Sequence, residues 1–247
     1  MELNQTIEKS NDFLKNGIDR IPTGIPSLDD TLCGGLPRGS LTLIATRPAM
    51  GKTTFAMQLA GNIATAGKFV YFCSMESNVI WFNRFFRKQT GTIPVRETLY
   101  FDGHAKADVP YITEKIRSFA KCDAVFVDYL QLMHSTKSKD NRVQEVTEIT
   151  RDLKLMAKSL NVPVVVCAQL SRSAGGKGTS HKPQLADLRP GSIEQDADIV
   201  IFPFRESFNI EDTATNEKAE LIVVKNRYGP TGAIPGHWDH ERMKFEE

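Results

Sequence analysis

The residues best suited to chemistry lie in a short turn between an apolar run, residues 41–45, and a segment with helical spacing that begins at Phe55. The residues that we expect to bind a nucleotide are Arg47, Pro48, Ala49, Met50, Gly51, Lys52, Thr53 and Thr54. In such a turn, backbone N–H groups and the positive end of the following helix face phosphate oxygens. Lys52 adds a positive charge at the β- and γ-phosphates, and the Thr53 hydroxyl can join the shell of a Mg²⁺ ion. The order of strand, turn and helix is typical of a phosphate-binding P-loop.

This turn departs from the usual phosphate-binding pattern at one position. The pattern places a glycine five residues before Gly51, where this chain has Thr46. A chance Gly-Lys-Thr in an ordinary strand-to-helix turn is therefore an alternative that the motif, taken alone, leaves open.

Two carboxylates follow apolar, strand-like segments elsewhere in the chain. Glu76 comes directly after residues 68–75, and Asp128 ends the run 124–128. Because α/β sheets bind ligands at the carboxyl ends of their strands, Glu76 is a candidate general base for an attacking water. Asp128 has the position of a carboxylate that orders a Mg²⁺ ion opposite Thr53. A helix-capping role is the alternative for both carboxylates.

Three further polar residues are candidates for sensing or stabilising a γ-phosphate. Gln169 ends the apolar run 162–169, and its neutral amide can donate one hydrogen bond that disappears after hydrolysis. Lys225 and Arg227 stand two residues apart at the end of a strand and therefore point in the same direction. This geometry is expected of cations that reach a neighbouring subunit's γ-phosphate, and a solvated pair of charges is the alternative.

The segment 171–183 carries three cations, no acidic residue and several glycines. A simple linker would have this composition. In a ring, however, six copies of a modest basic loop would form a positive channel that can hold DNA, although the net charge of one chain is only +1. Arg172 and Lys177 in this segment are therefore candidate DNA-binding residues.

These residues need a frame that brings several strand ends together. At 247 residues, of which 40% are hydrophobic, the chain can form one large α/β domain. We expect a mostly parallel twisted sheet with helices on both faces over residues 21–247, preceded by a linker or docking helix within residues 1–20. A frayed terminus is the alternative for this N-terminal segment. Residues 77–120 are expected to be mostly helical with breaks at residues 91–94 and 101–104, and residues 142–160 to form a long amphipathic helix. Four aromatic residues have helical spacing and are expected in the core rather than in a base-stacking platform: Trp81, Phe82, Phe85 and Phe86.

The remaining composition favours a soluble cytoplasmic protein. The four cysteines show no Cys-x-x-Cys spacing, and Cys73 and Cys167 fall within apolar runs, which indicates reduced core thiols. His237 and His240 lack a third ligand at a suitable spacing, so a surface turn is expected rather than a metal site. No run approaches the ~18 consecutive apolar residues of a membrane span, and no membrane partner is expected.

In their order and spacing, these motifs resemble the RecA-like motor domain of DnaB-type replicative helicases, from about Thr23 to Pro230. The matching segments are residues 47–54, 74–76, 127–133, 140–142, 153–154, 161–164, 168–173, 192–198 and 225–230. This ordered set is far more specific than any single motif.

The resemblance implies a ring hexamer that hydrolyses ATP at its subunit interfaces and unwinds DNA by moving 5′ to 3′ along one strand. The implied roles are phosphate and Mg²⁺ binding by Lys52 and Thr53, water activation by Glu76, metal ordering by Asp128, γ-phosphate sensing by Gln169, and action in trans by Lys225 and Arg227. The loop around Arg189 and Gly191 would contact the DNA backbone. The N-terminal helix would dock on the adjacent subunit, and a helicase loader is a further candidate partner.

The sequence departs from the family's usual pattern in three ways. The family's all-helical N-terminal domain, which contacts primase, has no counterpart here, so the resemblance does not extend to coupling with primase. The 187–192 loop is one residue shorter than the usual form, and the segment between Glu76 and Asp128 is short. A compact viral or mobile-element helicase and an excised domain both fit these departures.

Two other functions stay open from the sequence. One is a RecA-like recombinase or regulatory ATPase that binds DNA or a protein client without unwinding. The other is an assembly factor that binds nucleotide only as a structural ligand. The paired cations Lys225 and Arg227 and the run 192–198 favour the helicase.

Overall fold

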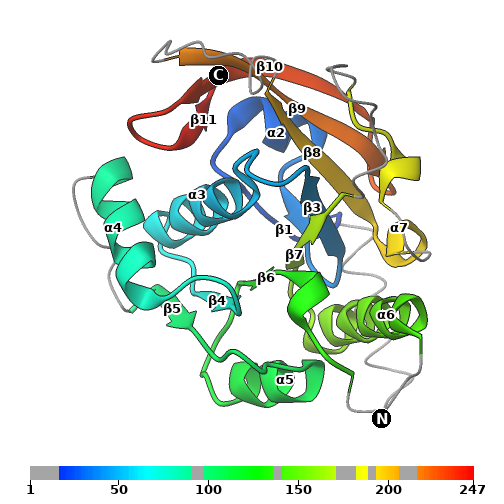
Figure 1. The fold of residues 1–247 in the computed structure, drawn as a ribbon. Helices are drawn as coiled ribbons and strands as arrows, with labels where there is room; N and C mark the ends of the chain where they lie inside the picture. The colour runs from blue at the N-terminus through cyan, green and yellow to red at the C-terminus, as the bar shows by residue number, and fades with distance from the viewer. Residues whose placement is uncertain (1–16, 91–96, 136–140, 171–181, 189–192, 206–215) are drawn as a thin grey trace.

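The computed structural model describes residues 17–90, 97–135, 141–170, 182–188, 193–205 and 216–247. Among these residues, nine strands form one sheet in the order β11-β10-β9-β8-β3-β7-β6-β4-β5 (Figure 1). Their bounds are β3 Leu41–Thr46, β4 Val70–Ser74, β5 Leu99–Asp102, β6 Ala124–Asp128, β7 Val164–Gln169, β8 Ile199–Arg205, β9 Asn216–Asn226, β10 Gly232–Asp239 and β11 Lys244–Glu246. The strands from β8 to β5 are parallel, and β9, β10 and β11 extend the sheet in antiparallel pairs.

Helices cover both faces of the central strands, as expected (Figure 1). The helices on one face are α2 Pro26–Thr31, α3 Lys52–Thr65 and α4 Val79–Thr90, and those on the other are α5 Val109–Arg117, α6 Arg142–Leu160 and α7 Ile193–Asp196. The alternation of side chains along each strand separates two cores. Ile44 of β3, for example, packs with α3 and α4, whereas its neighbour Leu43 packs with α5 and α6. The smaller elements are the two-stranded sheet of β1 Arg20–Ile21 with β2 Leu36–Pro37, and the short 3-10 helices η1 Leu130–Leu132 and η2 Leu185–Asp187.

The long helix α6 matches the sequence expectation for residues 142–160. At its start, the Asn141 side chain accepts a hydrogen bond of 2.9 Å from the Val143 N–H. At its end, Asn161 adopts a left-handed conformation with φ 51°. Its apolar stripe is buried against the sheet and includes Val146, Ile149, Leu153 and Met156.

The expectation that residues 77–120 are mostly helical was wrong at β5. This strand pairs in parallel with β4 and forms the edge of the sheet. A run of four residues is too short for its periodicity to separate strand from helix. Its position depends on tertiary contacts, among them a hydrogen bond of 2.8 Å from the Tyr71 hydroxyl to Asp102.

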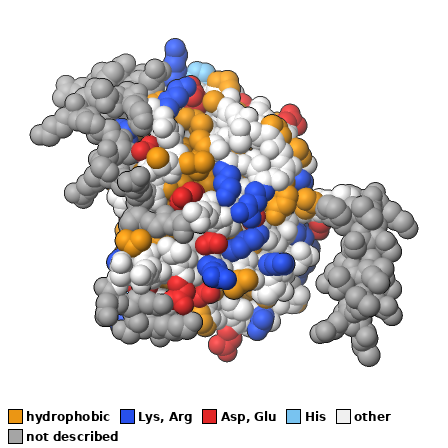
Figure 2. Space-filling model, turned by 90° about the vertical axis from the view of Figure 1, so that its right-hand side faces the viewer, with side chains coloured by type: hydrophobic (Ala, Val, Ile, Leu, Met, Phe, Trp, Pro, Cys, Tyr) orange, Lys and Arg blue, Asp and Glu red, His pale blue; other side chains and the backbone are white. Residues whose placement is uncertain are grey.

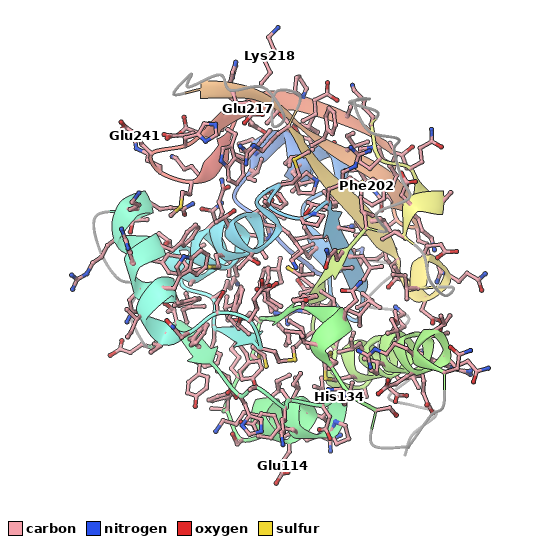
Figure 3. The ribbon with its side chains drawn as sticks, in the orientation of Figure 1. Glu114, His134, Phe202, Glu217, Lys218 and Glu241 are labelled. Carbon is pink, nitrogen blue, oxygen red and sulfur yellow. The ribbon has the colours of Figure 1, made fainter. Side chains whose placement is uncertain are left out.

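The C-terminal strands support the sheet and the helix that follows β3. Gln58 of α3 donates a hydrogen bond of 2.7 Å to the Phe245 carbonyl and accepts one of 2.8 Å from the Phe245 N–H, which fixes β11 on α3. Figure 3 shows Phe202 inside the molecule, and Lys218 of β9 and Glu114 of α5 pointing away from it. The segment expected to form the docking helix lies largely outside the described residues. Of the helices that the structure describes, none is long and apolar enough to span a membrane.

Candidate active site

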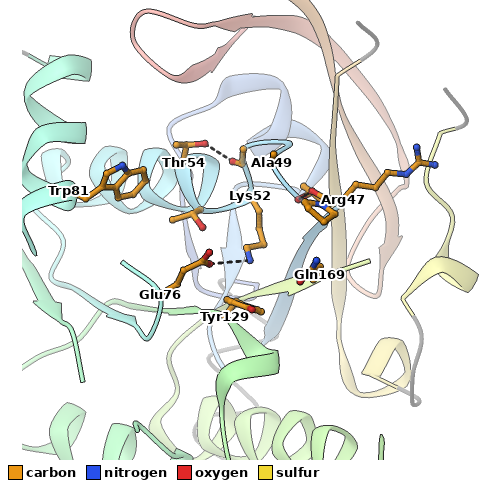
Figure 4. Close-up of a pocket in the computed structure, with 12 residues that line it drawn as sticks. Arg47, Ala49, Lys52, Thr54, Glu76, Trp81, Tyr129 and Gln169 are labelled. Carbon is orange, nitrogen blue, oxygen red and sulfur yellow. Dashed lines mark hydrogen bonds and ion pairs between the residues drawn. The ribbon is translucent and has the colours of Figure 1, made fainter. Parts of the chain in front are cut away.

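A pocket lies at the carboxyl edge of the parallel strands, where β3 leads into α3 (Figure 4). Its lining includes most of the expected nucleotide-binding residues together with Glu76 and Gln169. The full lining consists of Thr46, Arg47, Pro48, Ala49, Gly51, Lys52, Thr53, Thr54, Glu76, Trp81, Tyr129 and Gln169. Met50, also expected there, is buried and is not among the lining residues. In Figure 4, Glu76 and Gln169 lie on opposite sides of the Lys52 side chain.

The backbone of the turn requires left-handed conformations at two positions. Gly51 has φ 90° and Ala49 has φ 64°. A Cβ atom on Gly51 would lie 2.9 Å from Trp238 and 3.0 Å from the Thr54 hydroxyl, so only glycine fits there. Thr46, where the usual pattern has glycine, is the last residue of β3 and lies in register with Gln169. Because its backbone is extended, a glycine is not required at this position.

Lys52 lies between two carboxylates. Its ammonium is 3.6 Å from Oδ1 of Asp128 and 4.0 Å from Oε2 of Glu76, and the Asp128 side chain is fully buried. The same ammonium lies 3.9 Å from the centre of the Tyr129 ring, a cation–π contact. Lys52 thus offsets the charge of both acids, and a polyphosphate in the turn would compete with them for this cation.

The residues expected to bind Mg²⁺ are in contact. The Thr53 hydroxyl lies 3.0 Å and 3.2 Å from the two carboxylate oxygens of Asp128. A hydroxyl and one carboxylate at the foot of a phosphate loop suit Mg²⁺, which keeps several waters and takes further oxygens from the phosphates. Within the described residues, no group of three or more His, Cys, Asp or Glu side chains could hold a metal. The donor set therefore fits a metal that arrives with the nucleotide.

The aromatic residues of α4 lie in the core, and one of them also lines the pocket. Phe82, Phe85 and Phe86 are buried, as expected. Trp81 is partly buried and packs against the same core, where it stacks on Phe85, and it also lines the pocket. Tyr129 and Trp238 were also missed as supports of this site. Tyr129 stands directly after Asp128, whereas no sequence pattern connects Trp238 to Gly51.

Lys225 and Arg227 lie at the opposite edge of the sheet from this pocket. Lys225 is in register with Val200, close to the amino end of β8, and the Arg227 N–H donates to the Asp198 carbonyl. Both cations bind the end of α7: Lys225 donates to the Glu194 carbonyl at 2.5 Å, and Arg227 to the Gln195 carbonyl at 2.8 Å. Burial and the nearby Arg227 guanidinium lower the pKa of Lys225.

The surface on this side of the molecule is rich in cations. Figure 2 views the side on which α7 lies in Figure 1 and shows Lys and Arg side chains gathered across it. The expected DNA-binding residues Arg172, Lys177, Arg189 and Gly191 lie outside the described residues.

The cysteines and histidines do not form a site among the described residues. All four cysteines are free, and Cys73 and Cys167 are buried, as expected of core thiols. The expectation of a surface turn was wrong for His237, which lies within β10 and pairs with both β9 and β11. His240 follows that strand and lies 3.1 Å from Glu217 of β9.

Comparison with known proteins gives a consistent result. A sequence model of the family described as DnaB-like helicase C terminal domain matches residues 20–95 and 84–247. The chain is 34% identical to the replicative DNA helicase DnaC of Bacillus subtilis and to the replicative DNA helicase DnaB of Geobacillus stearothermophilus. These matches cover 94% and 92% of the chain, but the chain spans only 57% and 56% of the two relatives.

Solved structures show the same similarity. One of them, described as an ATPase domain, superposes with a TM-score of 0.84 and 28% identity, over 99% of this chain and 96% of that one. A DnaB-like replicative helicase, whose structure was described with its interactions with primase, superposes with a TM-score of 0.83 and 30% identity, over 99% of this chain and 65% of that one. A KaiC-like protein of Pyrococcus horikoshii, at 19% identity and a TM-score of 0.68, shares the fold. The expected RecA-like α/β fold is confirmed.

Proposed function

The chain belongs to the DnaB-like helicase C-terminal domain family, and we propose on that basis that it is the ATP-hydrolysing motor of a ring-shaped replicative DNA helicase. The observation that carries this proposal is the convergence of Lys52, Glu76 and Gln169 on one pocket, with the buried Asp128 carboxylate 3.6 Å from the Lys52 ammonium. A non-hydrolysing assembly factor would need the phosphate-binding turn but not the acid and amide around it. The match to the helicase family favours a helicase over a recombinase.

The residues of the pocket can each perform one part of phosphoryl transfer to water. The N–H groups of the turn and Lys52 hold the phosphates, and Glu76, whose side chain is 54% exposed, is open to water and can accept its proton. Thr53 and Asp128 would hold Mg²⁺, which neutralises charge on the β- and γ-phosphate oxygens when bound. Gln169 would hydrogen-bond the γ-phosphate from the side opposite Glu76.

We propose that a second subunit completes the pocket. Lys225 and Arg227 cannot serve the pocket of their own chain, because they lie at the other edge of the sheet. A head-to-tail contact brings the amino edge of one copy against the carboxyl edge of the next, and repetition of such a contact closes a ring, here a hexamer. The helix within residues 1–20 would dock on the adjacent subunit and leave residues 21–247 as the motor.

Single-stranded DNA would pass through the centre of this ring, with translocation from 5′ to 3′. The residues proposed to contact it are Arg172, Lys177, Arg189 and Gly191. A helicase loader is a further proposed partner, and the cytoplasmic replication machinery is the proposed place of action. Interaction with primase is described for a similar helicase.

The test is an ATPase and unwinding assay on a forked DNA duplex. We expect hydrolysis that single-stranded DNA stimulates, that chelation of Mg²⁺ abolishes, and that Lys52→Ala lowers by about a thousandfold or more. Stimulated hydrolysis without unwinding would support the recombinase or regulatory ATPase instead. Nucleotide binding without any turnover would support the assembly factor.

A further inference from the structure

Gln131 lies in η1, directly behind the pocket, and pairs with the backbone of Gln169. Its side-chain amide donates a hydrogen bond of 3.2 Å to the Gln169 carbonyl and accepts one of 3.2 Å from the Gln169 N–H. One side chain therefore satisfies both main-chain groups of the residue proposed to sense the γ-phosphate.

The strand register explains why this pairing is needed. On one side, β7 pairs with β3 as far as Gln169, opposite Thr46. On the other side, its pairing with β6 ends at Val166, opposite Val127. The last residues of β7, beyond Val166, therefore pair with β3 on one side but not with β6 on the other. The Gln131 amide takes the place of that strand at Gln169.

Gln131 is itself fixed from the other side. One nitrogen of Arg142, the first residue of α6, donates hydrogen bonds of 2.9 Å to the carbonyls of Gln131 and Met133. Arg142 also pairs with Glu145, one turn along α6, and Glu145 accepts the Ser135 N–H at 2.9 Å. The Ser135 N–H and the Arg142 guanidinium lower the pKa of Glu145, so this acid stays charged at neutral pH.

We propose that Gln131 is the positioning residue of the γ-phosphate sensor: it holds Gln169 in place at the end of β7, and Arg142 holds Gln131. This inference rests on the proposed function and adds to it a residue that does not touch the nucleotide. Tyr129, the residue directly before η1, also lines the pocket and contacts Lys52. Changes at the γ-phosphate are thereby linked to the start of α6.

The test compares two glutamines that make the same kind of pair. Gln58 also donates to and accepts from one backbone residue, Phe245, but on β11, away from Gln169. We expect Gln131→Leu to lower the preference for a non-hydrolysable ATP analogue over ADP by about tenfold, with the Kd for ADP within about twofold of wild type. Gln58→Leu should lower Tm and leave the preference unchanged. Fluorescent-nucleotide competition measures both affinities, whether or not the chain turns over ATP.

The double variant separates positioning from an independent effect. If Gln131 acts through Gln169, the double variant Gln131→Leu/Gln169→Ala should show the same preference for the ATP analogue over ADP as Gln169→Ala alone. Once the Gln169 side chain is gone, its position no longer affects binding, so the change at Gln131 should have no further effect. Arg142→Ala should weaken the preference, and Arg142→Lys should restore part of it.

An unchanged preference in Gln131→Leu, or losses that add in the double variant, would overturn the inference. Equal losses in Gln131→Leu and Gln58→Leu would also overturn it, because both would then report general destabilisation. Failure of the proposed function would look different: absent hydrolysis with intact discrimination of the γ-phosphate.

Discussion

At the scale of single residues, the pocket depends on backbone shape as much as on charge. The turn between β3 and α3 presents its N–H groups to one point only if Ala49 and Gly51 hold left-handed conformations. Trp238, from a strand nearly two hundred residues later in the chain, lies directly against Gly51. The phosphate-binding turn is therefore held by the C-terminal strands as well as by its own sequence.

Gly51→Ala should disable the turn. The added methyl group would meet Trp238 and Thr54 at about 3 Å while the backbone carries a strained φ. We expect loss of nucleotide binding, measured by fluorescent-nucleotide titration. Gly67→Ala is the matched control, because Gly67 has φ 77° with nothing within 4 Å. It should cost about 1 kcal/mol of stability and leave binding intact; equal binding by both variants would contradict this account.

The thiols should differ sharply in reactivity. Burial raises the pKa of Cys73 to about 12 and that of Cys122 to about 11, and raises that of the fully buried Cys167 as well. At pH 8 the thiolate fraction of Cys73 would be on the order of 10⁻⁴. Native protein treated with iodoacetamide should therefore be modified first at Cys33, which is exposed. Rapid modification of Cys73, detected by peptide mass spectrometry, would show that its strand opens.

Single residues also show the limit of prediction from sequence. Lys52, Thr53, Glu76 and Asp128 could be predicted, because local spacing places the first two at the start of a helix that follows a strand and the two acids at strand ends. Gln131 could not, since its role depends on how far β6 and β7 run side by side. A register of this kind is a property of the folded sheet.

At the scale of elements, the parallel strands could be predicted from their apolar runs, whereas β5 could not. Each predicted run is at least five residues long and nearly all buried, as in β6 and β7. The amino ends of these strands are held by polar contacts. Asp123, at the start of β6, has a buried side chain that accepts from Arg38 at 2.8 Å and from the Phe69 N–H at 3.0 Å.

Asp123→Asn should destabilise the fold in a pH-dependent way. Burial favours the neutral acid, but Arg38, the Phe69 N–H and Lys121 together lower the pKa of Asp123 below its ordinary 3.8. A lowered pKa means that the charged form contributes stability above pH 3.8, and that this contribution is lost as the pH falls through the folded-state value. We expect a loss of about 2 kcal/mol at pH 7, measured by urea unfolding.

The control for this variant is Asp19→Asn. Asp19 binds the same Arg38 at 2.7 Å but is 72% exposed, so its change should cost less than about 1 kcal/mol. The difference in stability between the two variants should narrow as the pH falls below 3.8. A gap that stays constant from pH 7 to pH 3 would show that the Asp123 charge is not the source of the difference.

At the scale of the whole molecule, one sheet carries two complementary edges. The carboxyl edge holds the nucleotide pocket, and the amino edge holds Lys225 and Arg227 on the end of α7. The net charge of +1 does not reveal this division, because the division depends on where the charged residues lie and not on how many there are. The sequence predicts both sets of residues, and the fold adds that they cannot meet within one chain.

The most direct test of the account is to mix two inactive variants and measure ATP hydrolysis with single-stranded DNA present. Lys52→Ala damages the pocket and keeps the cations, whereas Arg227→Ala keeps the pocket and removes one cation. An active interface needs an Arg227→Ala chain on the pocket side and a Lys52→Ala chain on the cation side. If chains from an equal mixture enter the ring at random, each condition is met about half of the time, so about a quarter of the interfaces should be active. We predict recovery to about a quarter of wild-type hydrolysis. A mixture no more active than its components, or full activity of Arg227→Ala alone, would contradict the claim that neighbouring chains share one site.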